Sequence, residues 1–211
     1  MKNKIVKALS TALIIGISST TFAAANPFND LDSNHWAYSK VIALVDAGII
    51  EPDSNDRGSF FGNMKASRYD VVKMVYNLHM KKNDVTTSTE NPFSDVPAGH
   101  PATVAIARLA ADGIIKPSID GKFHGNDKIT RYDMAVMIAN LLSKDANLSI
   151  ASTTNMFSDV PDNHPAYNAV MTLTKEEILS GYGDGTFKGD KNVTRFEAAL
   201  MINKVFEKYY K

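Results

Sequence analysis

A unit of about 64 residues is repeated three times in this chain, and the repetition constrains the fold more than any single motif does. The copies open at Asn26-Pro27-Phe28-Asn29-Asp30, Asn91-Pro92-Phe93-Ser94-Asp95 and Asn155-Met156-Phe157-Ser158-Asp159. Each later carries a short signature: Ser67-Arg68-Tyr69-Asp70, Thr130-Arg131-Tyr132-Asp133 or Thr194-Arg195-Phe196-Glu197. A unit of this size buries little core alone, so the copies are predicted to pack against one another.

The first 25 residues are typical of an export signal. Lys2, Lys4 and Lys7 precede an apolar stretch at 8–18, and small residues at 21–25 suit cleavage. A bilayer span needs about 20 apolar residues, so a retained anchor is the less favoured alternative. We therefore expect a signal peptide at 1–25 and repeats at 26–82, 91–144 and 155–211, joined by polar linkers at 83–90 and 145–155.

Composition narrows the possible partners. The chain has no cysteine, which excludes disulfides, thiol catalysis and cysteine metal sites. Without residues 1–25, which hold three lysines and no acid, 20 basic and 23 acidic residues remain. This balance argues against a nucleic-acid partner, which favours a basic surface. We expect an exported chain at the cell wall or cell surface, with no membrane span after signal removal.

Each repeat is predicted to contain a helix, a loop and a second helix, which makes the fold all-α. Apolar residues of the first helix recur at helical spacing, namely Ala37, Val41, Leu44 and Val45; Ala102, Ile106, Leu109 and Ala110; and Ala166, Val170, Leu173 and Thr174. Gly48 and Gly113 are predicted to end this helix in a left-handed conformation. Glu177 stands at that place in the third repeat, so a different turn is expected there.

The second helix is predicted to begin at the signature. Ser67, Thr130 and Thr194 are suited to the N-cap, and an acidic residue follows three positions later in each copy, as in a capping box. Broad apolar stripes follow the signatures, so these three helices could form a common bundle with the first helices around it.

The signature arginines Arg68, Arg131 and Arg195 would lie on the first helical turn, where the helix dipole disfavours a cation. One explanation is an anionic ligand held by the guanidinium and by free backbone N–H groups. The other is an internal salt bridge to the opening aspartate of the same or a neighbouring repeat. Both remain open from the residues alone.

Several other residues have a structural and a functional interpretation. Asp30, Asp95 and Asp159 could accept hydrogen bonds from a turn or from sugar hydroxyls. Trp36 could stack on a sugar or pack at a helix start. The Ser180-Gly181-Tyr182 loop could approach a ligand closely or form an ordinary tight turn. One histidine per repeat (His35, His100 and His164) does not make a metal cluster, so no metal and no cofactor are expected.

These motifs together resemble the S-layer homology (SLH) domain. The resemblance is carried by Phe93-Ser94-Asp95-Val96, Ala111-Asp112-Gly113-Ile114-Ile115, Gly181-Tyr182-Gly183-Asp184-Gly185-Thr186-Phe187 and Thr194-Arg195-Phe196-Glu197, in this order. It implies an all-α pseudo-threefold trimer of modules with a central helix bundle. It also implies grooves between the modules that hold secondary cell-wall polysaccharide, often through a pyruvylated N-acetylmannosamine whose carboxylate meets the signature arginine.

The resemblance transfers unevenly to the three repeats. Arg131 and Arg195 match the family pattern, Arg68 matches with a serine before it, and the three opening aspartates match. The Ser180-Gly181-Tyr182 loop matches only in the third repeat, because Glu51-Pro52 and Lys116-Pro117 replace it elsewhere. Unequal ligand occupancy is therefore expected, strongest at the third loop.

The sequence thus predicts a non-enzymatic protein that binds a cell-wall glycan. The alternatives are polyamine-modified peptidoglycan as the ligand, or a surface that docks an unidentified protein. A wall hydrolase is disfavoured, because no Gly-x-Ser-x-Gly motif or phosphate loop occurs and no carboxylate pair stands out.

Overall fold

The structure, a computed structural model, describes residues 26–52, 58–83, 90–151 and 154–211. The expected signal peptide and most of the first linker lie outside these residues. The described residues form α1 (Tyr38–Asp46), α2 (Arg68–His79), α3 (Thr103–Ala111), α4 (Arg131–Asp145), α5 (Tyr167–Lys175) and α6 (Arg195–Tyr209). None of these helices is long and apolar enough to cross a membrane.

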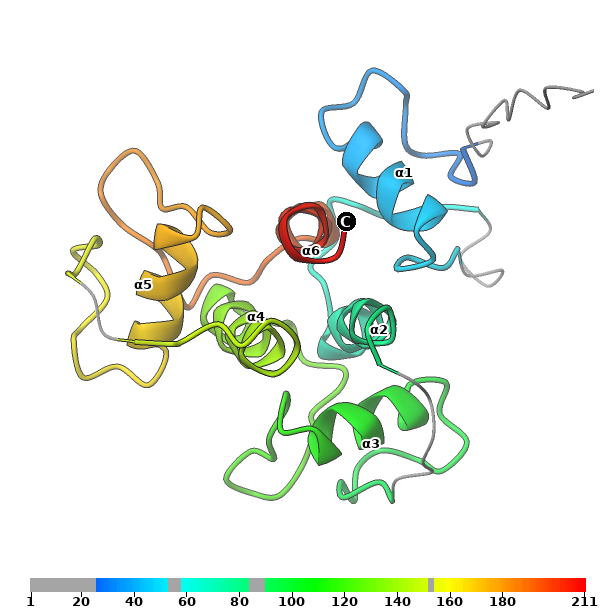
Figure 1. The fold of residues 1–211 in the computed structure, drawn as a ribbon. Helices are drawn as coiled ribbons and strands as arrows, with labels where there is room; N and C mark the ends of the chain where they lie inside the picture. The colour runs from blue at the N-terminus through cyan, green and yellow to red at the C-terminus, as the bar shows by residue number, and fades with distance from the viewer. Residues whose placement is uncertain (1–25, 53–57, 84–89, 152–153) are drawn as a thin grey trace, which may run out of the picture.

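The second helices of the three repeats, α2, α4 and α6, lie together at the centre, and the first helices lie outside them (Figure 1). Each outer helix packs against the central helix of the preceding repeat. Thus α3 packs on α2, α5 packs on α4, and α1 closes the ring by packing on α6. The predicted all-α fold with a central bundle is confirmed, and the ring ties the first repeat to the third.

A capping box starts each central helix, as predicted. In α6 the Thr194 hydroxyl accepts the Glu197 backbone N–H at 3.1 Å, and the Glu197 carboxylate accepts the Thr194 N–H at 2.7 Å. The same reciprocal pair joins Ser67 to Asp70 in α2 and Thr130 to Asp133 in α4. The central helices therefore start at the signature in all three repeats.

The entry to each central helix is fixed by its neighbours in space. The preceding segments meet as antiparallel bridges: Lys65 with Thr194, Ser67 with Lys128, and Thr130 with Asn192. Backbone N–H groups of the first turn donate to the loop of the next repeat, for example Arg131 to the Lys191 carbonyl at 3.1 Å and Tyr132 to the Gly189 carbonyl at 2.9 Å. These bonds join the repeats at one end of the bundle.

A glycine and an aromatic ring meet closely at each junction between repeats. A Cβ added at Gly125 would lie 2.1 Å from the Tyr69 ring, and one at Gly189 would lie 2.0 Å from the Tyr132 ring. Gly62 meets Phe196 in the same way at 2.1 Å. Each ring belongs to the residue after a signature arginine, so these glycines let the rings pack directly on the backbone of the next repeat.

Two local predictions were wrong. Glu177 adopts the same left-handed conformation as Gly48 and Gly113, with φ of 60° against 65° and 74°, so the turn is the same in all three repeats. The second linker does not start at Asp145, which is the last residue of α4. Leu148 and Ile150, within the expected linker, pack against the core, and this apolar contact orders the segment.

Candidate functional site

Each signature arginine reaches into the following repeat. Its Nε donates to the carbonyl oxygen of a buried phenylalanine at 2.8 Å, which is Phe123 for Arg68, Phe187 for Arg131 and Phe60 for Arg195. The guanidinium also lies over the same ring, with its central carbon 5.0, 4.4 and 5.2 Å from the respective centroids. Such cation–π contacts hold the positive charge in place while leaving donors available.

The opening aspartates hold the same phenylalanines from the other side. Asp159 accepts the backbone N–H groups of Phe187 and Lys188, both at 2.7 Å. Asp30 and Asp95 bind the corresponding pairs in their own repeats. Burial by itself raises the pKa of Asp95, but the hydrogen bonds from backbone N–H groups, together with the charge of His124, outweigh it and lower that pKa. Arginine and opening aspartate are therefore coupled through a phenylalanine, not through the direct salt bridge considered from the sequence.

Three equivalent grooves lie beside the arginines, and each is named here after its central helix. The α2 groove has a volume of about 70 Å³, the α4 groove about 220 Å³ and the α6 groove about 100 Å³. Each is lined by the arginine of the preceding repeat, the segment after the outer helix, and the face of the central helix. The principal lining residues are Arg195, Glu51, Asp70 and Asn77; Arg68, Lys116, Asp133 and Asn140; and Arg131, Ser180, Glu197 and Lys204.

The arginines differ in how fully their charge is neutralised. In the α2 groove Arg195 is hydrogen-bonded to the Asp70 carboxylate. In the α4 groove Arg68 lies 4.0 Å from Asp133. In the α6 groove Arg131, which is only 6% exposed, donates to the carbonyl oxygens of Phe187 and Ser180, the latter at 2.8 Å. Among the described residues Arg131 forms no ion pair, and its partners are carbonyl oxygens and the rings of Phe187 and Tyr182.

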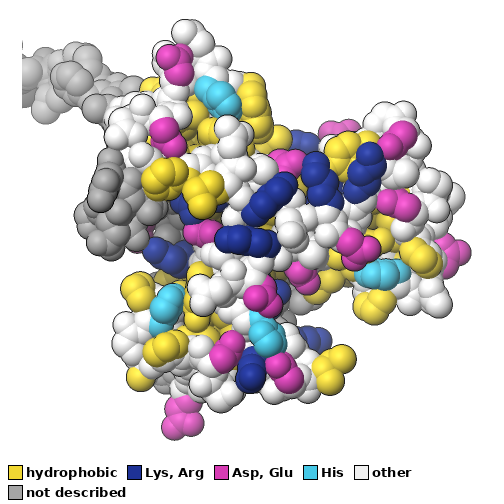
Figure 2. All heavy atoms as spheres, turned by 180° about the vertical axis from the view of Figure 1, so that it is seen from behind, with side chains coloured by type: hydrophobic (Ala, Val, Ile, Leu, Met, Phe, Trp, Pro, Cys, Tyr) yellow, Lys and Arg dark blue, Asp and Glu magenta, His cyan; other side chains and the backbone are white. Residues whose placement is uncertain are grey.

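Further cations gather beside Arg131. Three cationic side chains lie over the Tyr182 ring, those of Arg131, Lys188 and Lys191, at 5.1, 4.5 and 5.1 Å from its centroid. The Lys191 ammonium also donates to the Tyr182 hydroxyl at 2.9 Å, and this bond raises the pKa of Lys191. In Figure 2, which views the molecule from behind Figure 1, Lys and Arg side chains lie across the middle of the face, with acidic side chains between them. Lys188 pairs with Asp184 at 2.9 Å and Lys191 lies 3.6 Å from Glu197, so these two lysines each have an acidic partner, whereas Arg131 has none among the described residues.

Acidic residues of the capping boxes also line the grooves. Burial by itself raises the pKa of Glu197, but its bond from the Thr194 N–H and the charges of Lys191 and Lys65 outweigh this and lower the pKa. Glu197 lies 3.6 Å from Lys191, so it balances a lysine rather than Arg131. From the sequence, these acids are expected only to cap the central helices. Their second role was not found because it depends on which repeat lies opposite.

The structure places the predicted ligand residues unevenly. Ser180 lines the α6 groove. Tyr182 approaches Arg131, and Gly181 packs so closely on Phe157 that a Cβ would lie 2.2 Å from its ring. Trp36 is 60% exposed and meets Phe196 edge-on at 5.7 Å, and it is not among the residues that line the α2, α4 and α6 grooves. Asp30, Asp95 and Asp159 also lie outside these linings.

One proposed contribution to anion binding is wrong. The first-turn backbone N–H groups, expected to be free for a ligand, donate instead to loop carbonyls and to the N-cap side chains. A neighbouring repeat covers the helix N-terminus and satisfies these donors. Any anion in the grooves must therefore be held by side chains.

The repeated histidines stabilise helix starts. His100 and His164 each stack on a signature tyrosine at 4.0 Å, and His35 stacks on Phe196 at 4.4 Å. The Nδ1 of each accepts the backbone N–H two residues later, at the N-terminus of the outer helix. Across the described ranges, no group of three or more acidic or histidine side chains could hold a metal ion.

Sequence comparison places the chain in a family. The profile of the S-layer homology domain matches residues 27–57, 92–135 and 157–199, which together make up more than half of the chain. The chain belongs to the S-layer homology domain family. Its three matched segments fall on the three repeats and include the signature arginines Arg131 and Arg195.

Relatives of the chain include a cellulosome-anchoring protein, a cell surface glycoprotein and an S-layer protein. The chain is 32% identical over 130 residues to a cellulosome-anchoring protein of Acetivibrio thermocellus, covering 61% of this chain and 27% of that protein. It is 40% identical over 157 residues to cell surface glycoprotein 1 of the same organism, covering 72% of this chain and 7% of the relative. The S-layer protein sap of Bacillus anthracis is 27% identical over 211 residues, 99% of this chain and 25% of that protein. The chain thus spans about a quarter or less of these relatives' lengths.

Proposed function

We propose that this chain is an exported, non-catalytic anchoring protein that binds an anionic glycan of the bacterial cell wall through its inter-repeat grooves. One observation carries the proposal: at three equivalent places, an arginine of one repeat lies in a groove built by the next. The names of the relatives, which include S-layer and anchoring proteins, support a surface location.

The proposed ligand is a pyruvylated sugar of a secondary cell-wall polysaccharide. A guanidinium presents planar pairs of N–H donors that match a carboxylate, and Arg131, held by the Phe187 and Ser180 carbonyls, has the position for this role. Lys188 and Lys191 add positive charge nearby. A polyamine-modified peptidoglycan is the second candidate ligand, and the acidic Asp70 and Asp133 would favour it in the other two grooves.

We propose that the grooves are unequal and that the α6 groove contributes most. In the α2 groove Arg195 already forms an ion pair with Asp70, so the carboxylate of a ligand must displace this internal partner. In the α6 groove Arg131 has no carboxylate partner among the described residues, and its hydrogen bonds go to carbonyl oxygens.

Binding rather than catalysis also agrees with the carboxyl groups. A general acid needs a raised pKa, whereas the shifted acids here, such as Asp95, Asp112 and Glu197, all have lowered pKa values. We therefore expect the protein to bind purified cell walls without releasing sugar.

The test is co-sedimentation and calorimetry of the purified chain with purified walls, before and after chemical removal of pyruvate. Arg68→Ala, Arg131→Ala and Arg195→Ala are compared, with Lys122→Ala at an exposed loop position as control. We expect Arg131→Ala to lose most of the binding, and pyruvate removal to abolish it in the unaltered chain. Lys191→Ala, a more exposed change, should weaken binding even if Arg131→Ala fails to fold.

Three outcomes would contradict the proposal. Equal losses from all three arginine variants would remove the inequality of the grooves. Unchanged binding after pyruvate removal would favour modified peptidoglycan as the ligand. Assembly of the chain seen by light scattering, with no wall binding, would favour a protein-docking role.

A further inference from the structure

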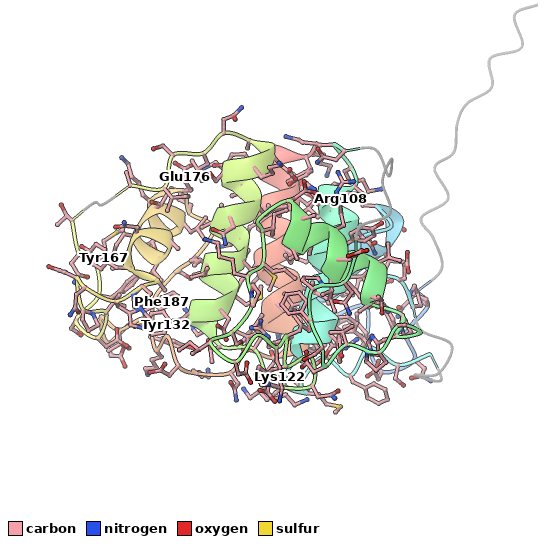
Figure 3. All side chains as sticks on the ribbon, turned by 90° about the horizontal axis from the view of Figure 1, so that it is seen from below. Arg108, Lys122, Tyr132, Tyr167, Glu176 and Phe187 are labelled. Carbon is pink, nitrogen blue, oxygen red and sulfur yellow. The ribbon has the colours of Figure 1, made fainter. Side chains whose placement is uncertain are left out.

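We propose that His79 is a pH-sensitive switch for the α4 groove, whose wall loosens when the imidazole loses a proton. The inference rests on the proposed function, because it adds regulation to one of the three proposed binding grooves. The switch, called here the His79 switch, consists of His79 at the end of α2 and Asp112, the residue that follows α3. In Figure 3 this end of the bundle is marked by Arg108, an ion-pair partner of Asp112, and the opposite end by Tyr132.

The imidazole of His79 lies between two carboxylates. Its side chain is 0% exposed, with Nδ1 2.8 Å from the Asp145 carboxylate on α4 and Nε2 2.9 Å from the Asp112 carboxylate. Carboxylates only accept hydrogen bonds, so the doubly protonated ring is needed to satisfy both contacts at once. The other titratable groups that face this cluster are Arg108 on α3, Lys144 on α4, Lys82 after α2 and Tyr210 after α6.

The loss of a proton breaks the contact with Asp112 rather than the one with Asp145. The Asp145 side chain is buried and has His79 as its ion-pair partner. Asp112 is partly exposed and pairs also with Arg108 and Lys144. An unpaired buried carboxylate is the more costly of the two, so we assign the remaining proton to Nδ1. The lone pair of Nε2 then faces the Asp112 carboxylate, and two acceptors at 2.9 Å repel each other.

Asp112 links the His79 switch to the wall of the α4 groove. Residues 114–116 follow it closely and line this groove. On the other side of the groove, Asn140 of α4 donates to the Ile114 carbonyl at 3.0 Å. The wall is thus held by His79 at Asp112 and by Asn140 two residues later. When the first contact breaks, the second is left to hold this segment against the central helices.

The α2 and α6 grooves lack an equivalent switch. An apolar residue stands in place of His79 in each of the other central helices, namely Leu142 in α4 and Phe206 in α6. The pH response is therefore expected in one groove of the three, and the other two provide an internal reference. Because His79 lies about 16 Å along α2 from Arg68, given a rise of 1.5 Å per residue, the switch acts on the groove wall and leaves the arginine in place.

The titration of His79 has the direction that the switch requires. Burial by itself lowers the pKa of His79, but the hydrogen bonds and charges of Asp145 and Asp112 outweigh it and raise that pKa. The imidazolium therefore persists below the ordinary value of about 6.5 and is lost as the pH rises through the folded-state value. The α4 groove is expected to be firm in mildly acidic surroundings and to loosen at alkaline pH.

Backbone hydrogen exchange of the full chain, followed by nuclear magnetic resonance, tests the switch. The N–H groups of Ile114 and Ile115 both donate to the Leu109 carbonyl, at 2.8 and 3.2 Å. The other repeats contain the same pair of bonds, formed by Ile49 and Ile50 to Leu44, and by Ile178 and Leu179 to Leu173. These two pairs are references that report any change in the stability of the whole chain.

The expected result is a pH-dependent loss of protection at one pair. Between about pH 6 and 9, after correction for the intrinsic exchange rate, the protection of Ile114 and Ile115 should fall about ten- to hundredfold relative to the reference pairs. This factor corresponds to the loss of one hydrogen bond between charged groups. The midpoint of the fall should coincide with the titration of the His79 ring signals.

Asp112→Asn removes the switch while keeping the contact. An amide can donate to the neutral Nε2 and can accept from the imidazolium, so the protection of Ile114 and Ile115 should no longer depend on pH. His79→Gln has no titratable ring and should give the same result if Asp112→Asn does not fold. His124→Gln is the matched control, because His124 also lies between two carboxylates, 2.8 Å from Asp120 and 3.9 Å from Asp127, on an exposed loop. This control should keep the pH response.

Three outcomes would overturn the proposal. They are constant protection of Ile114 and Ile115, an equal fall in all three pairs, which would assign His79 to overall stability alone, and a pH response that persists in Asp112→Asn. The measurement needs no glycan, so its failure is distinct from that of the proposed function. If walls bind in an Arg131-dependent way but the protection is constant, the switch is wrong and the anchoring role stands. If the protection responds but no wall is bound, the anchoring role is wrong and the pH-dependent movement stands.

Discussion

The hydroxyl group of Tyr210 donates a hydrogen bond of 2.6 Å to the carboxylate of Asp145, which joins the third repeat to the end of the second. The same carboxylate is hydrogen-bonded to Nδ1 of His79 at 2.8 Å. The other ring nitrogen, Nε2, is hydrogen-bonded to the Asp112 carboxylate at 2.9 Å. The His79 side chain is 0% exposed. A buried polar network thus ties the C-terminal ends of α2, α4 and α6, opposite the end where the signature arginines lie.

The network predicts a pH-dependent stability centred on His79. Both ring nitrogens face carboxylates, which only accept hydrogen bonds, so the folded state favours the imidazolium. Burial by itself lowers the pKa of His79, but the bonds and charges of Asp145 and Asp112 outweigh it and raise that pKa. The resulting stabilisation is full below the unfolded-state pKa of about 6.5 and is lost as pH rises through the folded-state value.

Urea unfolding between pH 5 and 9 would measure this dependence. We expect the free energy of unfolding to fall on the alkaline side in the unaltered chain and to be flat there in His79→Asn. At pH 6 the variant should lose about 3–5 kcal/mol, because two carboxylates lose a buried cation. His124→Asn, at a partly exposed loop position, should keep the alkaline slope; a slope retained in His79→Asn would refute the assignment.

At acidic pH the dependence is reversed, and the free energy of unfolding is expected to fall as the pH falls. Burial by itself raises the pKa of Asp112, but the bonds from Arg108 and His79 lower it overall. A lowered carboxyl pKa contributes stability above the unfolded value, near 3.9, which is lost as pH falls through the folded value. We expect Asp112→Asn to reduce the loss of stability measured between pH 5 and 2.

Tyr210→Phe tests the link between the second and third repeats. The substitution removes a hydrogen bond to a charged acceptor and should lower the free energy of unfolding by about 1.5–3 kcal/mol in chemical denaturation. Tyr209→Phe is the matched control, since the Tyr209 hydroxyl meets the more exposed Glu176 at 2.8 Å. Equal losses in the free energy of unfolding for the two substitutions would mean that the burial of Asp145 does not strengthen its hydrogen bond.

Gly125→Ala tests the contact between the first two repeats. The new Cβ would lie 2.1 Å from the Tyr69 ring, so the ring or the loop must move. We expect a loss of about 1–3 kcal/mol in the free energy of unfolding, as for overpacked sites. Gly99→Ala, where a Cβ meets nothing within 4 Å, should change stability by less than about 0.5 kcal/mol.

Glu177→Gly should stabilise the protein. Glu177 has φ of 60°, which costs a non-glycine residue about 1 kcal/mol and costs glycine little. Thermal unfolding should show a gain of about that size, while Gly113→Ala should show a comparable loss. A lower melting temperature for Glu177→Gly would mean that the glutamate side chain contributes more than its backbone conformation costs.

Local features of the fold could be predicted because they depend on nearby residues. The capping boxes join residues three positions apart, and the apolar faces recur every three or four positions. Of the two local errors, the one at Glu177 arose because the packed Ile178 and Leu179 impose a turn that the preference of glutamate disfavours. The His79 network escaped notice because its residues recur in no repeat pattern.

The sequence by itself determined the three repeats, the start of each central helix, and the arginine on its first turn, because these follow from short-range hydrogen bonds and hydrophobic periodicity. Only the tertiary structure decided what each arginine meets. Arg68 and Phe123 are 55 residues apart, and their contact exists because each outer helix packs on the central helix of the preceding repeat. That choice of neighbour depends on burying all three apolar faces at once. It pairs the Asp70 carboxylate with Arg195, whereas the hydrogen bonds of Arg131 go to carbonyl oxygens.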